Sequence, residues 1–81
     1  MNEYTFLQQL NSTIKEVIPS MPLEVTHSHL NYVQLDIKHV CGQNYTSLVQ
    51  IEYLQQLKKN MTKEEFVKTL VEMTKQRKVF H

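Results

Sequence analysis

The chain has a single cysteine, a single glycine and no tryptophan or alanine among its 81 residues. Because Cys41 is the only cysteine, an internal disulfide is excluded, and a reducing compartment is the simplest setting for the protein. Because Gly42 is the only glycine, a glycine-rich loop that cradles phosphate groups is excluded as well. Walker, dinucleotide-binding, kinase and HExxH motifs are also missing, so the sequence offers no known catalytic motif.

Long apolar runs and a large net charge are absent too. No apolar stretch approaches the roughly 20 residues that span a bilayer, and the amino terminus lacks the basic and apolar segments of a secretory signal. We therefore expect a cytoplasmic protein without membrane spans. The net charge of +1 is too small for a protein that binds duplex nucleic acid mainly by charge, and too positive for a mimic of nucleic acid.

The length and the content of 41% hydrophobic residues predict one small globular domain over residues 1–81. A chain this short buries only about 60–65% of its unfolded surface, so association with a partner or a second copy would supplement a small core. Lysine far outnumbers arginine, and asparagine, isoleucine and tyrosine are common. Their AT-rich codons favour an AT-rich genome, such as that of a bacterium, a phage or another mobile element.

The centre of the chain has the pattern of β-strands. Apolar and polar residues alternate in Tyr32–Val40, as in a strand with one buried face. Gly42–Asn44 then provides residues that tolerate the positive φ of a tight loop. The alternation resumes in Tyr45–Tyr53, so the sequence predicts a β-hairpin with a three-residue loop. That loop pairs Ile37 with Val49.

The second half of this region also fits a helix. Over Leu48–Lys59, apolar residues fall on one side of a helix and polar residues on the other, and Thr46 or Ser47 can serve as N-cap. The β propensity of Tyr45–Tyr53 favours the strand, whereas the composition of Leu54–Lys59 favours the helix. The element order is therefore α-β-β-β-α with the strand, or α-β-β-α-α with the helix.

A helix is predicted at the amino end of the chain. Apolar residues recur there at three- and four-residue spacing after Asn2, which suits an N-cap, and Pro19 ends the pattern. The apolar stripe consists of Phe6, Leu7, Leu10, Ile14, Val17 and Ile18. Leu23–His29 then forms a short polar strand, which suits a sheet edge, before a turn at residues 30–31.

The clearest local pattern lies near the carboxyl end. Thr62–Glu65 matches a capping box, and it predicts a long helix from Lys63 to about Arg77. The apolar face of this helix consists of Phe66, Val67, Leu70, Val71, Met73 and Thr74. Val79–His81 is expected to fray unless it docks on the rest of the protein.

Together these elements predict an α+β fold with two layers. The amino-terminal helix and the long carboxyl-terminal helix pack on one face of an antiparallel sheet of two or three strands. The other face of the sheet then meets water or a partner.

Metal binding and catalysis are not expected. His27 with His29 and His39 with Cys41 form two pairs of residues that suit zinc. A hairpin through residues 30–31 separates the pairs by roughly 20 Å at about 3.3 Å per residue, so we predict no metal site and no cofactor. Residues two apart on a strand are also too distant for a thiol and its base, which excludes Cys41 as a nucleophile activated by His39. We predict that the protein is not an enzyme.

Binding to another protein is the leading hypothesis, because the chain is small, nearly neutral and without catalytic motifs. The binding surface would be the polar sheet face, and the partner a host protein or a second copy of the chain. A phage or mobile-element regulator that inhibits a host protein fits the codon pattern. The residues predicted for this face are Tyr32, Gln34, Asp36, Lys38, Gln50 and Glu52.

The alternative is an accessory nucleic-acid-binding protein that recognises single-stranded DNA or RNA, or a DNA-binding regulator. Tyr32, Tyr45 and Tyr53 could stack on unpaired bases. Basic residues also gather near the ends of the helical segments, at Lys58, Lys59, Lys75, Arg77 and Lys78. Against this alternative, lysines and glutamates are mixed on the last helix, which is typical of a face in contact with water.

Overall fold

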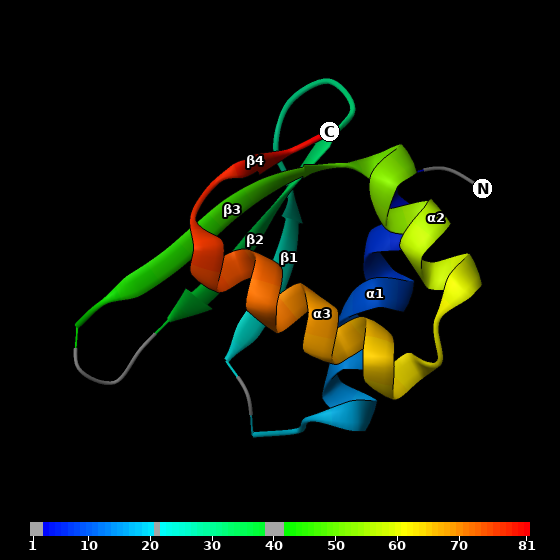
Figure 1. The fold of residues 1–81 in the computed structure, drawn as a ribbon, viewed down its shortest axis with the longest axis horizontal. Helices are drawn as coiled ribbons and strands as arrows, with labels where there is room; N and C mark the ends of the chain where they lie inside the picture. The colour runs from blue at the N-terminus through cyan, green and yellow to red at the C-terminus, as the bar shows by residue number, and fades with distance from the viewer. Residues whose placement is uncertain (1–2, 21, 39–41) are drawn as a thin grey trace.

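The computed structural model describes residues 3–20, 22–38 and 42–81. The elements run in the following order (Figure 1): α1 (Glu3–Val17), β1 (Leu23–His27), β2 (Tyr32–Lys38), β3 (Asn44–Gln50), α2 (Ile51–Asn60), α3 (Lys63–Gln76) and β4 (Val79–Phe80). Within these residues the strands form one sheet in the order β1-β2-β3-β4. The first three are antiparallel, and β4 runs parallel to β3. The α+β class is confirmed.

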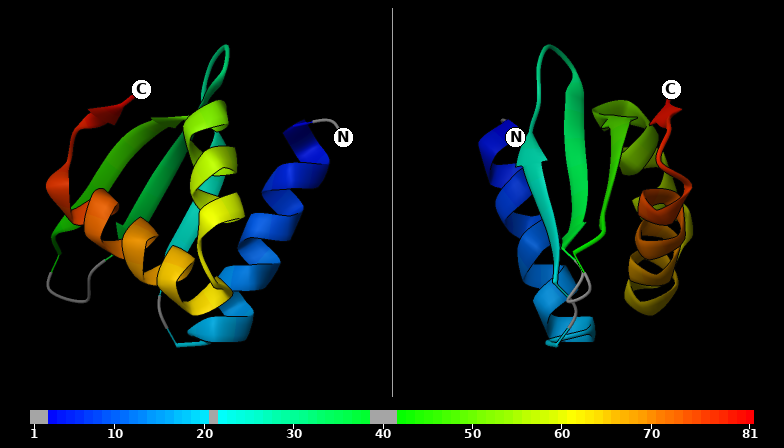
Figure 2. Two further views of the ribbon diagram at one scale, coloured as in Figure 1. Left: turned by 45° about the vertical axis from the view of Figure 1, so that its right-hand side comes forward. Right: turned by 90° about the vertical axis from the view of Figure 1, so that its left-hand side faces the viewer.

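The helices lie on one side of the sheet, which gives the two predicted layers (Figure 2). A single hydrophobic cluster joins all three helices to β1, β2 and β3. The apolar residues predicted for α3 are all buried, and Phe6, Leu10 and Ile14 supply the buried stripe of α1. No helix in the described part of the chain is long and apolar enough to cross a membrane.

The edge of the sheet at β1 is closed by a side chain of α1. The Asn11 amide nitrogen donates to the carbonyl oxygens of Val25, at 2.9 Å, and Leu7, at 3.1 Å, while its oxygen accepts from the Val25 amide at 3.0 Å. Asn11 thus occupies both outward-facing backbone groups of Val25, as a neighbouring strand would. The predicted edge position of β1 is confirmed, and α1 protects this edge against pairing with another chain.

The β2–β3 hairpin differs from the prediction in its register. Ile37 lies opposite Tyr45 rather than Val49, and the last pair is Lys38 with Asn44. The connection between the strands is therefore longer than the predicted three-residue loop. Because the register shift is an even number of residues, the apolar residues stay on the face that the alternation assigned to them.

A buried hydroxyl ties β3 to α3. Ser47 lies on the core face opposite Leu35, where it is 2% exposed. The Ser47 hydroxyl oxygen lies 2.8 Å from the carbonyl oxygen of Met73 and 3.1 Å from that of Thr74, to which it donates. The sequence prediction matched apolar residues only, and it could not anticipate carbonyl acceptors from the last turn of α3.

Each interpretation of the central region is right for part of its length and wrong for the rest. The predicted strand ends at Gln50 rather than Tyr53, and the predicted helix begins at Ile51 rather than Leu48. The reason lies in β2, which begins at Tyr32 and pairs there with Gln50, so the chain beyond Gln50 has no β2 residue to pair with. The observed order, α-β-β-β-α-α-β, combines the two predicted orders.

The start of α3 confirms the predicted cap. The Glu65 amide donates to the Thr62 hydroxyl oxygen at 3.2 Å, and the Thr62 hydroxyl donates to the Glu65 carboxylate at 3.0 Å. The helix ends at Gln76, where Arg77 adopts a left-handed conformation and donates its amide to Thr74 O. The proposed cap at Asn2 lies outside the described residues.

The carboxyl-terminal segment docks on the sheet. Val79 lies opposite Leu48 and Phe80 opposite Val49 in a parallel pairing, and the Leu48 amide donates to Lys78 O at 3.2 Å. Parallel neighbours need a long crossover, which α2 and α3 provide.

Replacement of Asn11 by alanine should destabilise the protein by about 1–3 kcal/mol, because the part-buried backbone groups of Val25 lose their partners. Urea unfolding followed by circular dichroism measures the change. Ser12→Ala is the matched control, since Ser12 is exposed on the same helix. Its replacement by alanine raises the helix propensity by a similar amount. Equal unfolding midpoints for the two variants would contradict the role of Asn11.

Candidate functional site

The candidate site is the side of the sheet that carries no helix, which we call the open face. Along each strand its residues alternate with buried ones, and they are exposed or half-buried. It consists of Glu24 and Thr26 from β1, Tyr32, Gln34, Asp36 and Lys38 from β2, Asn44, Thr46, Leu48 and Gln50 from β3, and Val79 from β4.

The structure brings most residues of the predicted protein-binding surface together. Five of them, Tyr32, Gln34, Asp36, Lys38 and Gln50, lie on the open face. Glu52 does not, because the chain leaves the sheet after Gln50 and Glu52 lies in the first turn of α2. The predicted set missed β1 and β4, whose contributions depend on strand order and register.

Two carboxylates lie across from each other on the open face, between the edge strand β1 and its neighbour β2. Asp36 on β2 is paired directly with Glu24 on β1, and like charges at such positions repel. Neither carboxylate forms an ion pair with a cation of the described residues. A positively charged group from outside the chain would relieve this repulsion.

Hydrogen bonds hold the Asp36 carboxylate in place. The Gln34 side-chain amide donates to Asp36 Oδ1 at 3.1 Å and to Oδ2 at 2.9 Å, and the Thr46 hydroxyl donates to Oδ1 at 2.8 Å. Both donors lie on the open face, one on the same strand and one on β3. The neighbouring side chains thus fix the orientation of this carboxylate on the open face.

An aromatic cluster marks one end of the open face. The Tyr32 hydroxyl and His81 Nδ1 are hydrogen-bonded at 2.6 Å, and the two rings meet edge to face with centroids 5.8 Å apart. The His29 ring stacks on the Tyr32 ring, and their centroids are 6.0 Å apart. Because Tyr32 and His81 are far apart in the sequence, no local pattern could have revealed this contact.

The basic residues named for the nucleic-acid alternative do not form one patch. Lys58 and Lys59 end α2, just before α3 begins, whereas Lys75, Arg77 and Lys78 lie at the far end of α3. With 14 residues, α3 separates the two groups by roughly 20 Å at 1.5 Å per residue.

The tyrosines named for base stacking already have neighbours. The Arg77 guanidinium lies 4.5 Å from the centre of the Tyr45 ring, and the Tyr53 ring lies 6.1 Å from that of Phe80. Stacking on a base would have to displace these contacts, which weakens the support for the alternative.

The described residues give no support for metal binding. His27 lies opposite Val33, at the end of the β1–β2 pair that is remote from Lys38. His39 and Cys41 lie outside the described residues. Within the described ranges, no three side chains of His, Cys, Asp or Glu gather as metal ligands would.

Comparisons with protein-family models, curated proteins and solved structures gave no match. The function must therefore be argued from the residues and geometry of this chain alone.

Tyr32→Phe should loosen β4 without disturbing the core, because it removes the hydrogen bond to His81 and keeps the ring. A loss of about 0.5–1.5 kcal/mol would speed hydrogen exchange at the Leu48 amide, which bonds to Lys78 O, by roughly 2- to 10-fold. Tyr53→Phe is the control, since it removes a hydroxyl near Phe80 that is not part of this contact. Unchanged exchange at Leu48 in Tyr32→Phe would show that the contact does not hold β4.

Proposed function

We propose that this protein is a small non-enzymatic binding module whose open face docks on a basic surface of another protein. The observation that carries this proposal is the pair of facing carboxylates, Glu24 on the edge strand β1 and Asp36 on β2, on a sheet face that no helix covers. A polar face with a few apolar groups is typical of transient interfaces.

The chemistry of the open face indicates what the partner offers. A lysine or arginine placed over Glu24 and Asp36 would form charge-assisted hydrogen bonds and remove the repulsion between them. Elsewhere on the open face, Tyr32, Leu48 and Val79 supply surface that a partner can bury, and Val79 is 47% exposed. The charges would set the orientation and the apolar groups would add affinity.

A partner of another kind fits this face better than a second copy of the chain. A two-fold axis close to the Glu24–Asp36 pair would bring the carboxylates of both copies together, and such like-charge contacts are unfavourable. Together with the AT-rich codon pattern, this favours a regulator or inhibitor of a host protein, encoded by a phage or mobile element and acting in the cytoplasm.

Photo-crosslinking tests the location of the interface. A photoreactive amino acid at Gln34 should capture a protein in cells of the encoding organism, whereas the same group at Lys68 on α3 should not. The captured protein is then purified, and its affinity for the chain is measured at two salt concentrations. We expect affinity to fall as salt rises, because exposed charge contacts are screened.

Glu24→Gln should weaken binding to the captured protein by roughly 10- to 150-fold, since one charge-assisted contact is worth about 1.5–3 kcal/mol. The same substitution should leave the stability of the free protein unchanged or raise it by about 0.2–1 kcal/mol, because it removes a like-charge pair. Glu72→Gln, on the exposed side of α3, is the charge-matched control and should change neither property.

Three results would contradict the proposal. Capture from Lys68 but not from Gln34 would place the interface on the helices. Equal binding by Glu24→Gln and Glu72→Gln would remove the carboxylate pair from the interface. Steeply salt-dependent binding of the purified chain to single-stranded or duplex oligonucleotides would favour the nucleic-acid alternative.

A further inference from the structure

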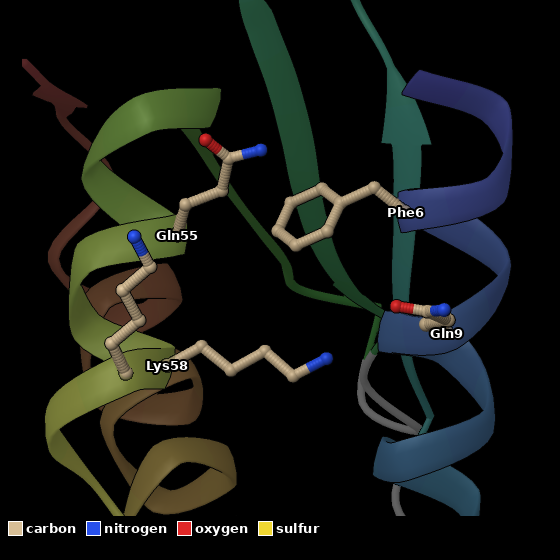
Figure 3. A pocket seen from close by; sticks show the side chains of 5 residues that line it. Phe6, Gln9, Gln55 and Lys58 are labelled. Carbon is tan, nitrogen blue, oxygen red and sulfur yellow. The ribbon is translucent and has the colours of Figure 1, made fainter. Parts of the chain in front are cut away.

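A second site lies in the helical layer, on the other side of the sheet from the open face. Phe6 and Gln9 of α1 and Gln55, Lys58 and Lys59 of α2 line a pocket of about 510 Å³ between the two helices. Figure 3 shows the Phe6 ring pointing from α1 into the space between the helices, and Lys58 reaching across from α2. The pocket shares no residue with the open face, so it is independent of the function proposed above.

The lining combines an apolar floor with a positively charged rim. The Phe6 ring is only 5% exposed, and Lys58 Nζ lies 5.8 Å from its centre. Among the residues whose side chains the structure describes, the other lining groups are two carboxamides and a second lysine, and none of these lining residues is a carboxylate. Neither lysine forms an ion pair within the described parts of the chain.

We infer that this pocket binds a small amphipathic carboxylate, with its apolar part over Phe6 and its carboxylate on Lys58 and Lys59. The ligand would take the place of the Lys58 side chain over the ring, and the freed ammonium would pair with the carboxylate. Gln9 and Gln55 can donate further hydrogen bonds from their amide groups.

The pocket is large enough for a small molecule. Small-molecule sites usually measure about 300–1,000 Å³, and this pocket falls in that range.

Titration of the ¹⁵N-labelled protein with sodium octanoate, followed by NMR, tests this inference. We expect saturable shifts at the backbone amides of Phe6, Gln9 and Gln55. Octan-1-ol and octyltrimethylammonium share the apolar chain but lack the anion, and they should bind at least 10-fold more weakly. Absence of saturable shifts at these amides with octanoate would overturn the inference.

Variants separate the charged rim from the apolar floor. Lys58→Gln/Lys59→Gln should weaken octanoate binding about 10-fold or more, whereas Lys68→Gln/Lys75→Gln, with the same change in net charge on α3, should not. Gln9→Glu should also weaken binding, because it adds a carboxylate to the lining. The variants change partly or fully exposed residues, and their spectra show whether the fold is kept. Equal affinity of octanoate for the two double variants would overturn the inference, because the two lysines would then not hold the carboxylate. Equal affinity of octanoate and octan-1-ol for the unchanged protein would overturn it as well.

Discussion

A sheet that is buried on one face only is the constraint on which the rest of this structure depends. Three strands direct their apolar residues to one side, and α1 and α3 cover that side. The described residues of this 81-residue chain supply one layer of helices for two sheet faces. The face without helices must therefore carry groups that tolerate water or that another molecule covers. In this protein it is mainly polar, with a carboxylate pair on β1 and β2.

The same constraint favours one route of association over another. Asn11 occupies the outward backbone groups of Val25, so a partner cannot readily add a strand at that position of the β1 edge. At the other side of the sheet, the pairing of β4 with β3 extends the ladder by one more strand. A partner of the kind that we propose would therefore be recognised by side chains of the open face rather than by backbone groups of β1, and side chains allow selection by charge.

Local sequence patterns predicted most of the helices and strands. Features that depend on contacts between distant parts of the chain could not be predicted from the sequence. Periodicity located α1, the strands and the buried face of α3, because burial of one face imposes it directly. The end of β3 depended on where β2 begins, and its register could not be chosen from the alternation, because two registers that differ by an even number of residues bury the same apolar side chains. Five residues of the predicted surface reached the open face, but Glu52 and the facing partner Glu24 could be assigned only from the pairing of strands.

The central claim, a sheet with one covered and one open face, is tested most directly by the access of a soluble paramagnetic probe to side chains of neighbouring strands. Leu35 lies on the covered face and is 0% exposed, while Gln34 and Leu48 lie on the open face. A neutral gadolinium chelate should broaden the signals of the Gln34 side-chain amide and the Leu48 methyl groups and spare the Leu35 methyl groups. Equal protection of the Leu35 and Leu48 methyl groups would contradict the account, because it would mean that the second face is covered as well.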